Sequence, residues 1–326
     1  MDKKRVYSGI RATGRLHLGN YFGAVKGMLE LQDQYDCVFS VVDLHAITTP
    51  YDPSALQNSV RDVLLDYLAS GLDPEKCLIE IQSRVPEHTE LAYLLSTIYP
   101  VSRLEDLPTY KDKKAQYPKY INMGLLYYPV LMAADIMLYK AEFVPVGIDQ
   151  EPHLEVAREI ARKFNSMFGQ TFPEPQRFAS NGEYVPSLTG EGKMSKTVEG
   201  SSILLTDDLE TIKKELAAVP TDSGTLGGEV PESGGVATLF TLLKLSNRQD
   251  LYNKYAQDYK DKSIKYSEMK PDVAQALFEI LKPIQEKRAK LADSFDLDNM
   301  LKKHTQICRE VASQTLKEVK EKMGLI

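Results

Sequence analysis

Short apolar, β-branched runs alternate with helix-like patterns through roughly the first two hundred residues. The strand-like runs lie at residues 5–10, 38–42, 78–81 and 143–146. The run at 38–42 is nearly all apolar, as expected of a strand that is buried on both faces. Helical spacing covers residues 20–34 and 56–68, the latter after Asp52-Pro53, a cap and first-turn proline. Strands separated by helices of this length predict an α/β fold, with a parallel sheet covered on both faces.

The pattern changes after about residue 206, beyond which the chain is helical with no further strand alternation. The longest amphipathic patterns cover residues 274–291 and 297–323, and Gly324 follows as a helix stop. A Gly- and Ser-rich stretch at 222–228 is typical of a loop. We therefore predict a Rossmann-like parallel-sheet domain at 1–205 and an all-helical domain at 206–326.

Composition changes this picture little. Of the 326 residues, 43% are hydrophobic and 26% are charged, which is ordinary for a globular protein. No secretory signal or membrane-spanning run is visible. The three cysteines, Cys37, Cys77 and Cys308, are widely spaced with no CxxC pair, which argues against a disulfide framework or a zinc site. Two of them sit beside apolar runs, where burial is expected. We expect a cytoplasmic protein with no membrane association.

The net charge of −6 is unlike that of a general nucleic-acid binder, which is usually basic. No DNA binding is expected. A local basic patch can still hold an RNA on an acidic protein, so RNA remains open.

A phosphate-binding pattern follows the first predicted strand. That strand ends near Gly9, and the loop at 13–20 is rich in small residues before a helix begins. Small residues let a nucleotide approach the backbone, and a helix amino terminus directs N–H groups at an anion. His17 and Asn20 would lie one turn apart there and could both donate to phosphate oxygens. The alternative is an ordinary strand-to-helix turn with a capping Asn.

A second pattern, at 190–197, places Lys193 and Lys196 around Ser195 between glycines. Two ammonium groups and a hydroxyl on a mobile loop can gather the β- and γ-phosphates of ATP, where negative charge builds up in the transition state. Solvated charges on a polar loop are the alternative.

Together the two patterns resemble the signatures of class I aminoacyl-tRNA synthetases, usually written HIGH and KMSKS. Their order and their predicted structural contexts match. Asn20 stands where the last His is usual, and Thr197 where the last Ser is usual. Asn is common at that position in the tryptophan-specific group, and Thr keeps the hydroxyl. The resemblance therefore implies the use of ATP.

Over essentially the whole chain, the closest resemblance is to the bacterial tryptophan-specific group. It is carried by residues 7–10, 43–48, 124–136 and 144–150. The phrase YPxLMAADI in the third segment is the most specific. The tyrosine-specific relatives look like YxxxQxxD, with Gln where this chain has Met132.

The selection of tryptophan has a physical basis in one helix face. Tyr128, Met132, Asp135 and Ile136 recur at i, i+4, i+7 and i+8 and so share that face. A carboxylate on an otherwise apolar face is costly unless it has a partner, and an indole N–H is a donor that would satisfy Asp135. The thioether of Met132 packs well against aromatic rings. A carboxylate satisfied inside the core is the alternative interpretation of Asp135.

The resemblance implies a role for each matching residue. The tryptophan site would comprise Tyr7, Gly9, His45, Tyr128, Met132, Asp135, Ile136, Val144, Val146 and Gln150, with Tyr128 and Gln150 taking the ammonium group. ATP would contact Arg11, Thr13, Gly19, Asn20, Lys113, Asp149, Val185 and Met194. The catalytic residues would be His17, Asn20, Lys193, Ser195 and Lys196. Lys113 is expected on a loop with Lys111, where a solvated charge run is the alternative.

The implied activity is that of a tryptophan–tRNA ligase. L-tryptophan would react with ATP and Mg²⁺ to give tryptophanyl-AMP and pyrophosphate, and tRNA(Trp) would then accept the amino acid. The metal would come with ATP, since the resemblance implies no protein metal site and no iron–sulfur centre. It also implies a homodimer, with residues at about 100–140 at its interface, and a helical domain that reads the anticodon.

Two alternative functions remain open. A tyrosyl-tRNA synthetase has the same fold class. A catalytically quiet paralogue that binds tryptophan should have lost a phosphate lysine or the motif histidine, and this chain keeps both.

Overall fold

The computed structural model describes residues 3–178, 184–196 and 198–326. Within them lies a parallel sheet of five strands in the order β3-β2-β1-β4-β5. The strands are β1 (Arg5–Arg11), β2 (Asp36–Val42), β3 (Leu78–Ile81), β4 (Phe143–Pro145) and β5 (Gln176–Phe178). The chain moves outward from β1 to β2 and β3, then returns to place β4 on the other side of β1. This reversal makes the carboxyl ends of β1 and β4 a switch point, where ligands bind in α/β sheets.

The central strands send alternate side chains into two different cores, because successive residues of a strand point to opposite faces. Val6 of β1 belongs to one core, and its neighbour Tyr7 belongs to the other. Phe39 and Val38 of β2 divide in the same way. The nearly continuous apolar run in β2 is therefore explained by burial on both faces.

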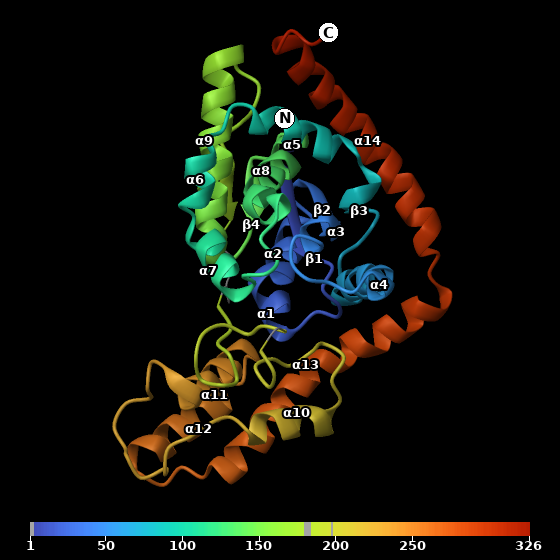
Figure 1. Ribbon diagram of the computed structural model, residues 1–326. Helices are drawn as coiled ribbons and strands as arrows, with labels where there is room; N and C mark the ends of the chain where they lie inside the picture. The colour runs from blue at the N-terminus through green and yellow to red at the C-terminus, as the bar shows by residue number, and fades with distance from the viewer. Residues whose placement is uncertain (1–2, 179–183, 197) are drawn as a thin grey trace.

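Helices of the first domain cover both faces of the sheet (Figure 1). One face carries α1 (Leu18–Asn20), which continues through a π-helical segment (Tyr21–Val25) into α2 (Lys26–Leu31), together with α4 (Pro53–Ser70). The other face carries α5 (Glu87–Ser96), α8 (Met123–Leu138) and α9 (Glu151–Phe168). Short helices connect these elements, namely α3 (Asp43–Ala46), α6 (Val101–Glu105), α7 (Pro108–Gln116) and two 3₁₀ turns, Gln82–Arg84 and Ile148–Gln150.

The described residues after 206 form helices joined by loops, with no strand among them, as predicted. Its helices are α10 (Leu209–Ala217), α11 (Gly234–Leu245), α12 (Gln249–Lys260), α13 (Tyr266–Ser294) and α14 (Leu297–Lys322). Helices α10 to α13 gather at one end of the molecule, and α14 runs back along the sheet domain (Figure 1). His304 of α14 accepts a hydrogen bond from the backbone N–H of Ile79 in β3, at 2.9 Å. The last helix is thus part of the first domain's packing.

The sequence located four of the five strands to within two residues at each end. The helices predicted at 56–68, 274–291 and 297–323 are also present, and Asp52 caps α4 through the Ser54 backbone N–H. The short strand β5 was not predicted, because three residues give too little period-two alternation to detect. All three cysteines are buried and free. None of the helices in the described ranges combines the length and apolarity that crossing a bilayer requires.

A buried ion pair joins the two halves of the chain beside the first motif. Asp66 of α4 is fully buried, and one carboxylate oxygen accepts the backbone N–H of Leu16 at 2.7 Å. The other oxygen accepts Nε of Arg288 from α13, also at 2.7 Å. Arg288 in turn bonds Asp62. The residue that precedes His17 is therefore fixed by a contact that depends on the helical half.

Replacing Asp66 with Asn should lower the free energy of unfolding by about 3 kcal/mol, because it leaves a largely buried guanidinium with one partner fewer. Urea unfolding of the full chain measures this change. The matched control is Asp33→Asn, which removes one partner of the exposed pair with Lys76 and should cost less than about 1 kcal/mol. Equal losses in the two variants would contradict this structural role for Asp66.

Candidate active site

A cavity of about 340 Å³ opens at the carboxyl ends of β1 and β4. Residues 7–11 of β1 form its floor, and Val144, Val146 and Gly147 line it from the end of β4 and the turn that follows. Gly9 has to lack a side chain, because a Cβ there would lie 2.7 Å from Cγ1 of Val42 and 3.1 Å from the carbonyl oxygen of Ser40. The cavity therefore lies at the switch point of the sheet.

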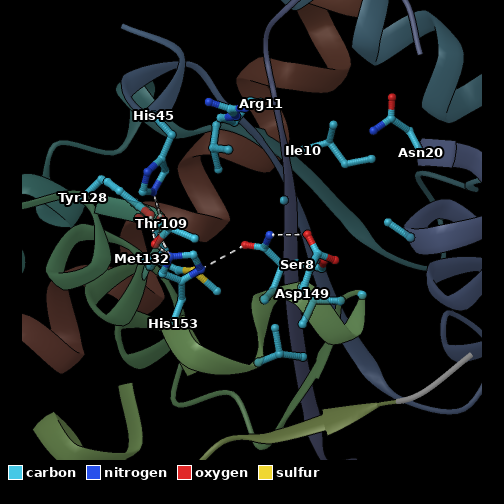
Figure 2. Close-up of a pocket in the computed structure, with 18 of the residues that line it drawn as sticks. Ser8, Ile10, Arg11, Asn20, His45, Thr109, Tyr128, Met132, Asp149 and His153 are labelled. Carbon is cyan, nitrogen blue, oxygen red and sulfur yellow. Dashed lines mark hydrogen bonds and ion pairs between the residues drawn. The ribbon is translucent and has the colours of Figure 1, made fainter. Parts of the chain in front are cut away.

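The cavity has two chemically different ends (Figure 2). His45, Tyr128, Met132 and His153 gather on one side, and Asn20 lies on the opposite side. The first side is built mainly from α8, whose residues Tyr128, Met132, Asp135 and Ile136 all line the cavity as their spacing predicts. An apolar and aromatic group fits at this end, and a polar one at the other.

Asp135 is the buried carboxylate at the α8 end. Its Oδ2 accepts Nε2 of His45 at 2.8 Å, and its Oδ1 accepts Nδ1 of His88 at 2.7 Å. The amide nitrogen of Gln82 lies 2.9 Å from both oxygens. Burial alone would raise the pKa of Asp135, but the charge of His88 and the bond from His45 hold it well below its usual range. The carboxylate is therefore ionised and an acceptor only.

This arrangement corrects one expectation from sequence. The carboxylate of Asp135 already has partners on this face of α8. They are His45, Gln82 and His88, which come from neighbouring segments. Sequence spacing along one helix cannot reveal partners that come from elsewhere in the chain. Of these three donors, His45 lines the cavity, whereas Gln82 and His88 are fully buried behind it. A ligand N–H at Asp135 would therefore meet His45 first.

A second hydrogen-bonded group surrounds the Tyr128 hydroxyl. It lies 2.6 Å from Nε2 of His153 and donates to the Thr109 hydroxyl at 2.9 Å. Nδ1 of His153 lies 3.2 Å from Oε1 of Gln150. Burial lowers the pKa of His153 to about 4, so the ring is neutral at neutral pH. These oxygen and nitrogen lone pairs suit an ammonium group.

The first motif forms a capped helix start on the opposite side. The side chain of Asn20 accepts the backbone N–H of His17, and Nδ1 of His17 accepts the backbone N–H of Asn20, at 3.2 and 3.3 Å. Because Nδ1 of His17 is an acceptor, its proton lies on Nε2, which can donate. Burial, together with the charges of Lys196 and Lys193, lowers the pKa of His17 to about 4. Asn20 is thus a capping residue as well as a cavity residue.

The second motif is folded against the first. In the segment that follows the second motif, the carbonyl oxygen of Ile203 accepts the backbone N–H of Leu18 at 2.9 Å, and the backbone N–H of Leu205 donates to Leu16 at the same distance. A Cβ on Gly19 would lie 3.2 Å from Cβ of Met194, so the two motifs meet closely at this glycine. Residues about 175 positions apart in sequence are therefore neighbours in space.

The two lysines of the second motif hold different partners. Nζ of Lys193 lies in the cavity, 2.8 Å from Oδ2 of Asp149. Nζ of Lys196 donates to the carbonyl oxygens of Gly14 and Thr13, at 2.8 and 3.4 Å. Burial lowers the pKa of Lys196 to about 8, against the opposing charges of Asp66 and Asp62. An anion that enters the cavity at this end would contact Lys193, which lines it. Lys196 follows three residues later in the chain and is not a lining residue.

Comparison with known proteins identifies the family. The family of class I tRNA synthetases for tryptophan and tyrosine (W and Y) matches residues 1–282. The chain is 40% identical to the tryptophan–tRNA ligase of Porphyromonas gingivalis over 98% of both sequences. The chain belongs to the bacterial tryptophanyl-tRNA synthetase family. This membership confirms the predicted family, fold class and enzyme class.

Two solved tryptophanyl-tRNA synthetases resemble this chain in structure. That of Mycoplasma pneumoniae matches with a TM-score of 0.88 and 32% identity, over 99% of this chain and 98% of that one. That of Campylobacter jejuni, solved in complex with ADP and tryptophan, matches with a TM-score of 0.83 and 32% identity, over 98% and 100%. Tyrosyl-tRNA synthetases of 17–18% identity share the fold alone.

The cavity brings together most of the residues that the tryptophanyl-tRNA synthetase resemblance implied. All ten residues expected at tryptophan line it, as do Arg11, Gly19, Asn20, Lys113, Asp149 and Lys193. His17, Thr13, Val185, Met194, Ser195 and Lys196 were expected there too but are not among its lining residues. They lie next to it in the packed motif region, where the Met194 backbone N–H donates to Val185 at 3.1 Å. Thr197 lies outside the described residues.

One placement was wrong. Lys111 and Lys113 lie in helix α7 and not on a loop, because Pro108 begins a helix whose charged residues conceal its pattern. Lys113 lines the cavity, and Lys111 pairs with Asp106 on the surface. The two interpretations of this charge run therefore apply to different residues: Lys113 faces the site, and Lys111 is solvated.

Several cavity residues were not predicted. They are Ser8, Ile10, Gly23, Ala24, Val42, Thr48, Thr49, Thr109, Leu125, Gly147 and His153. His153 had a usable signal, because it follows Gln150 by three positions at the start of α9 and so shares its face. Thr109 had none, since it enters the site only through the position of α7.

Proposed function

We propose that this chain is a tryptophan–tRNA ligase, which activates L-tryptophan with ATP and transfers it to tRNA(Trp). The observation that carries the proposal is a single cavity with an ionised carboxylate and a thioether at one end, and with Asn20 and Lys193 of the two signature motifs at the other. The indole ring of tryptophan would lie against Met132 and Asp135. The ammonium group of the amino acid would lie near Tyr128 and Gln150. The triphosphate would lie toward Asn20 and Lys193. The carboxylate of tryptophan then faces the α-phosphorus between the two ends.

Activation needs positioning and charge more than acid–base chemistry. The tryptophan carboxylate is already a nucleophile and attacks the α-phosphorus in line, while pyrophosphate leaves with its own negative charge. Neutral His17 would donate from Nε2 to a phosphate oxygen, and Lys193 would exchange Asp149 for phosphate. Ser195 and Lys196 would complete the group around the leaving pyrophosphate. The ribose hydroxyl of the tRNA then displaces AMP.

Magnesium would enter with ATP. No group of three or more His, Cys, Asp or Glu side chains in the described ranges is arranged to hold a metal. Mg²⁺ is commonly bound through substrate phosphates with few protein ligands, which fits a site of lysines and backbone amides. Its role would be to neutralise charge on the phosphates while the lysines hold them.

The assembly we propose is a cytoplasmic homodimer with one patch of this chain at its centre. Val101, Tyr120, Ile121 and Met123 lie exposed in the segment at about 100–140. Large apolar side chains that are exposed in one segment favour an interface there. The helical half at 206–326 would read the anticodon of tRNA(Trp), whose unpaired bases can stack and hydrogen-bond.

Charging of tRNA tests the complete reaction. Purified chain, ATP, Mg²⁺ and labelled tryptophan should give aminoacylated tRNA(Trp) transcript, and a transcript with an altered anticodon should be a poor acceptor. Formation of tryptophanyl-AMP without charging of the tRNA would support the activation step but contradict the ligase proposal.

The rate of activation should fall at alkaline pH through Lys196. This ammonium group is charged below its pKa of about 8, so kcat/KM for ATP should decrease as the pH rises through that value. A Lys196→Arg variant keeps its charge, so its decrease should move to higher pH even if its rate is lower. Identical pH profiles for the two proteins would contradict a requirement for the charge of Lys196.

A further inference from the structure

A second layer of buried charge lies directly behind Asp135, out of reach of the cavity. His88 of α5 is fully buried, and its Nδ1 is bonded to Oδ1 of Asp135 at 2.7 Å. Its Nε2 lies 3.2 Å from Oε1 of Glu80, a fully buried carboxylate in the middle of β3. The hydroxyl of Tyr139, at the end of α8, donates to the other oxygen of Glu80 at 2.6 Å. The chain Asp135–His88–Glu80–Tyr139 is continuous.

This arrangement fixes the protons of the group. Each ring nitrogen of His88 faces a carboxyl oxygen, and an imidazolium donates from both nitrogens, so the charged ring matches this geometry. Burial alone would lower the pKa of His88, but Glu80 and Asp135 outweigh it and raise the pKa to about 10. The His88 ring therefore lies between two buried carboxyl groups, of which Asp135 is the one that lines the cavity.

A buried ion group of this kind is weak evidence for a purely stabilising role. Removing charges from water costs free energy that a well-packed apolar cluster would not require. Tyr7, which lines the cavity, stacks on Tyr139 with ring centroids 5.4 Å apart and lies within the same apolar core. The charged groups of Asp135, His88 and Glu80 therefore lie where they can act on the cavity. The free-energy cost of burying them favours a role in recognition.

We propose that His88 and Glu80 are positioning residues for tryptophan recognition, which hold Asp135 as an oriented carboxylate ready to accept the indole N–H. The inference rests on the proposed function, since it assumes that the indole binds at Asp135. His88 sets the orientation from Oδ1, and Glu80 keeps His88 charged and turned toward Asp135. The other oxygen, Oδ2, accepts from His45, which lines the cavity, and from Gln82 behind it, and a carboxylate oxygen can accept a further hydrogen bond from the ligand.

The test separates recognition of the N–H from general damage to the pocket. The two ligands are tryptophan and β-(benzothien-3-yl)alanine, an isostere with sulfur in place of the indole N–H. The readout is kcat/KM for each in ATP–pyrophosphate exchange, expressed as the ratio of tryptophan to isostere. A site that reads a hydrogen-bond donor discriminates against an analogue that lacks it.

Glu80→Gln and His88→Asn should each lower this ratio by about tenfold or more, since a bond to an oriented charged group is worth that much. Most of the change should appear in KM for tryptophan, with kcat at saturation and KM for ATP within about twofold of the wild type. The amide introduced by His88→Asn would keep a neutral donor near Oδ1 of Asp135. A decrease of the ratio in that variant therefore measures the effect of the positive charge of His88. Tyr139→Phe, which removes only the hydroxyl bond to Glu80, should give a smaller decrease.

Folding failure is controlled in two ways. The double variant Glu80→Gln with His88→Asn removes both charges together, so it should fold where a single replacement does not, and its ratio should still be low. His304→Asn changes a buried histidine that bonds β3 at Ile79 but does not touch the group. It should reduce kcat/KM for both ligands equally, if at all.

Each outcome of this test either supports or overturns one of the two proposals. A wild-type ratio in Glu80→Gln and in the double variant, or equal losses for tryptophan and the isostere, would overturn the proposal while leaving the ligase function intact. An absence of tryptophan-dependent exchange in the wild-type protein would overturn the proposed function itself. A lowered ratio with unchanged kcat supports both.

Discussion

Replacing Asp135 with Asn should lower kcat/KM for tryptophan in ATP–pyrophosphate exchange by roughly 10²- to 10³-fold. The amide would present a donor or a weaker acceptor where the carboxylate now accepts from His45 and His88. It would also leave the His88 imidazolium facing one carboxylate fewer, which costs stability. The defect should be mainly in KM for tryptophan, because the phosphate end of the cavity is untouched.

The control for buried charge loss is Glu87→Gln. Glu87 is also largely buried, but it bonds Arg309 and Ser313 of α14 and does not line the cavity. This variant should keep kcat/KM for tryptophan within about twofold of the wild type, as expected away from the site. An Asp135→Asn protein that exchanges as well as the Glu87→Gln protein would exclude an indole contact at Asp135.

Replacing Lys193 with Ala should lower kcat for exchange by roughly 10²- to 10³-fold, as the loss of one preorganised charge at a transition state typically does. Lys193 lies in the cavity and its ammonium group is 2.8 Å from Asp149, so it can move from carboxylate to phosphate without leaving the site. The affinity for tryptophan should change by less than about twofold, because the lysine acts at the opposite end.

Lys111→Ala provides the matched control for charge. Lys111 pairs with Asp106 at the surface, so its replacement should leave kcat and KM unaffected. A Lys193→Ala enzyme with normal kcat and a raised KM for ATP would mean that the lysine binds ATP equally in the ground and transition states. That result would contradict its assignment as a catalytic residue.

The sequence was most informative where a regular period or a fixed spacing carries the information. The buried strand at 38–42, the cap at Asp52 and the face of α8 all follow from local rules and are present in the structure. The ten expected tryptophan-site residues come from β1, α3, α8, and β4 with the turn that follows it, and all ten line one cavity. Their individual roles remain predictions.

What sequence could not provide was the pairing of distant side chains. Glu80 is the charged residue of β3, and nothing in the local sequence shows that His88 and Tyr139 would contact it. Asp135 likewise gains its partners from α3, a 3₁₀ turn and α5. The helix α7 escaped detection because its surface is charged on nearly every side. Tertiary contacts, and not propensity, set these features.

ATP–pyrophosphate exchange with tryptophan and tyrosine in parallel tests the central claim most directly. We predict exchange that depends on tryptophan, with tyrosine giving no more than background at the same concentration. Exchange with tyrosine would place the specificity with the sister enzymes, and ATP binding without exchange for either amino acid would show a catalytically quiet protein. Either result would contradict the roles assigned to Asp135 and the two signature motifs.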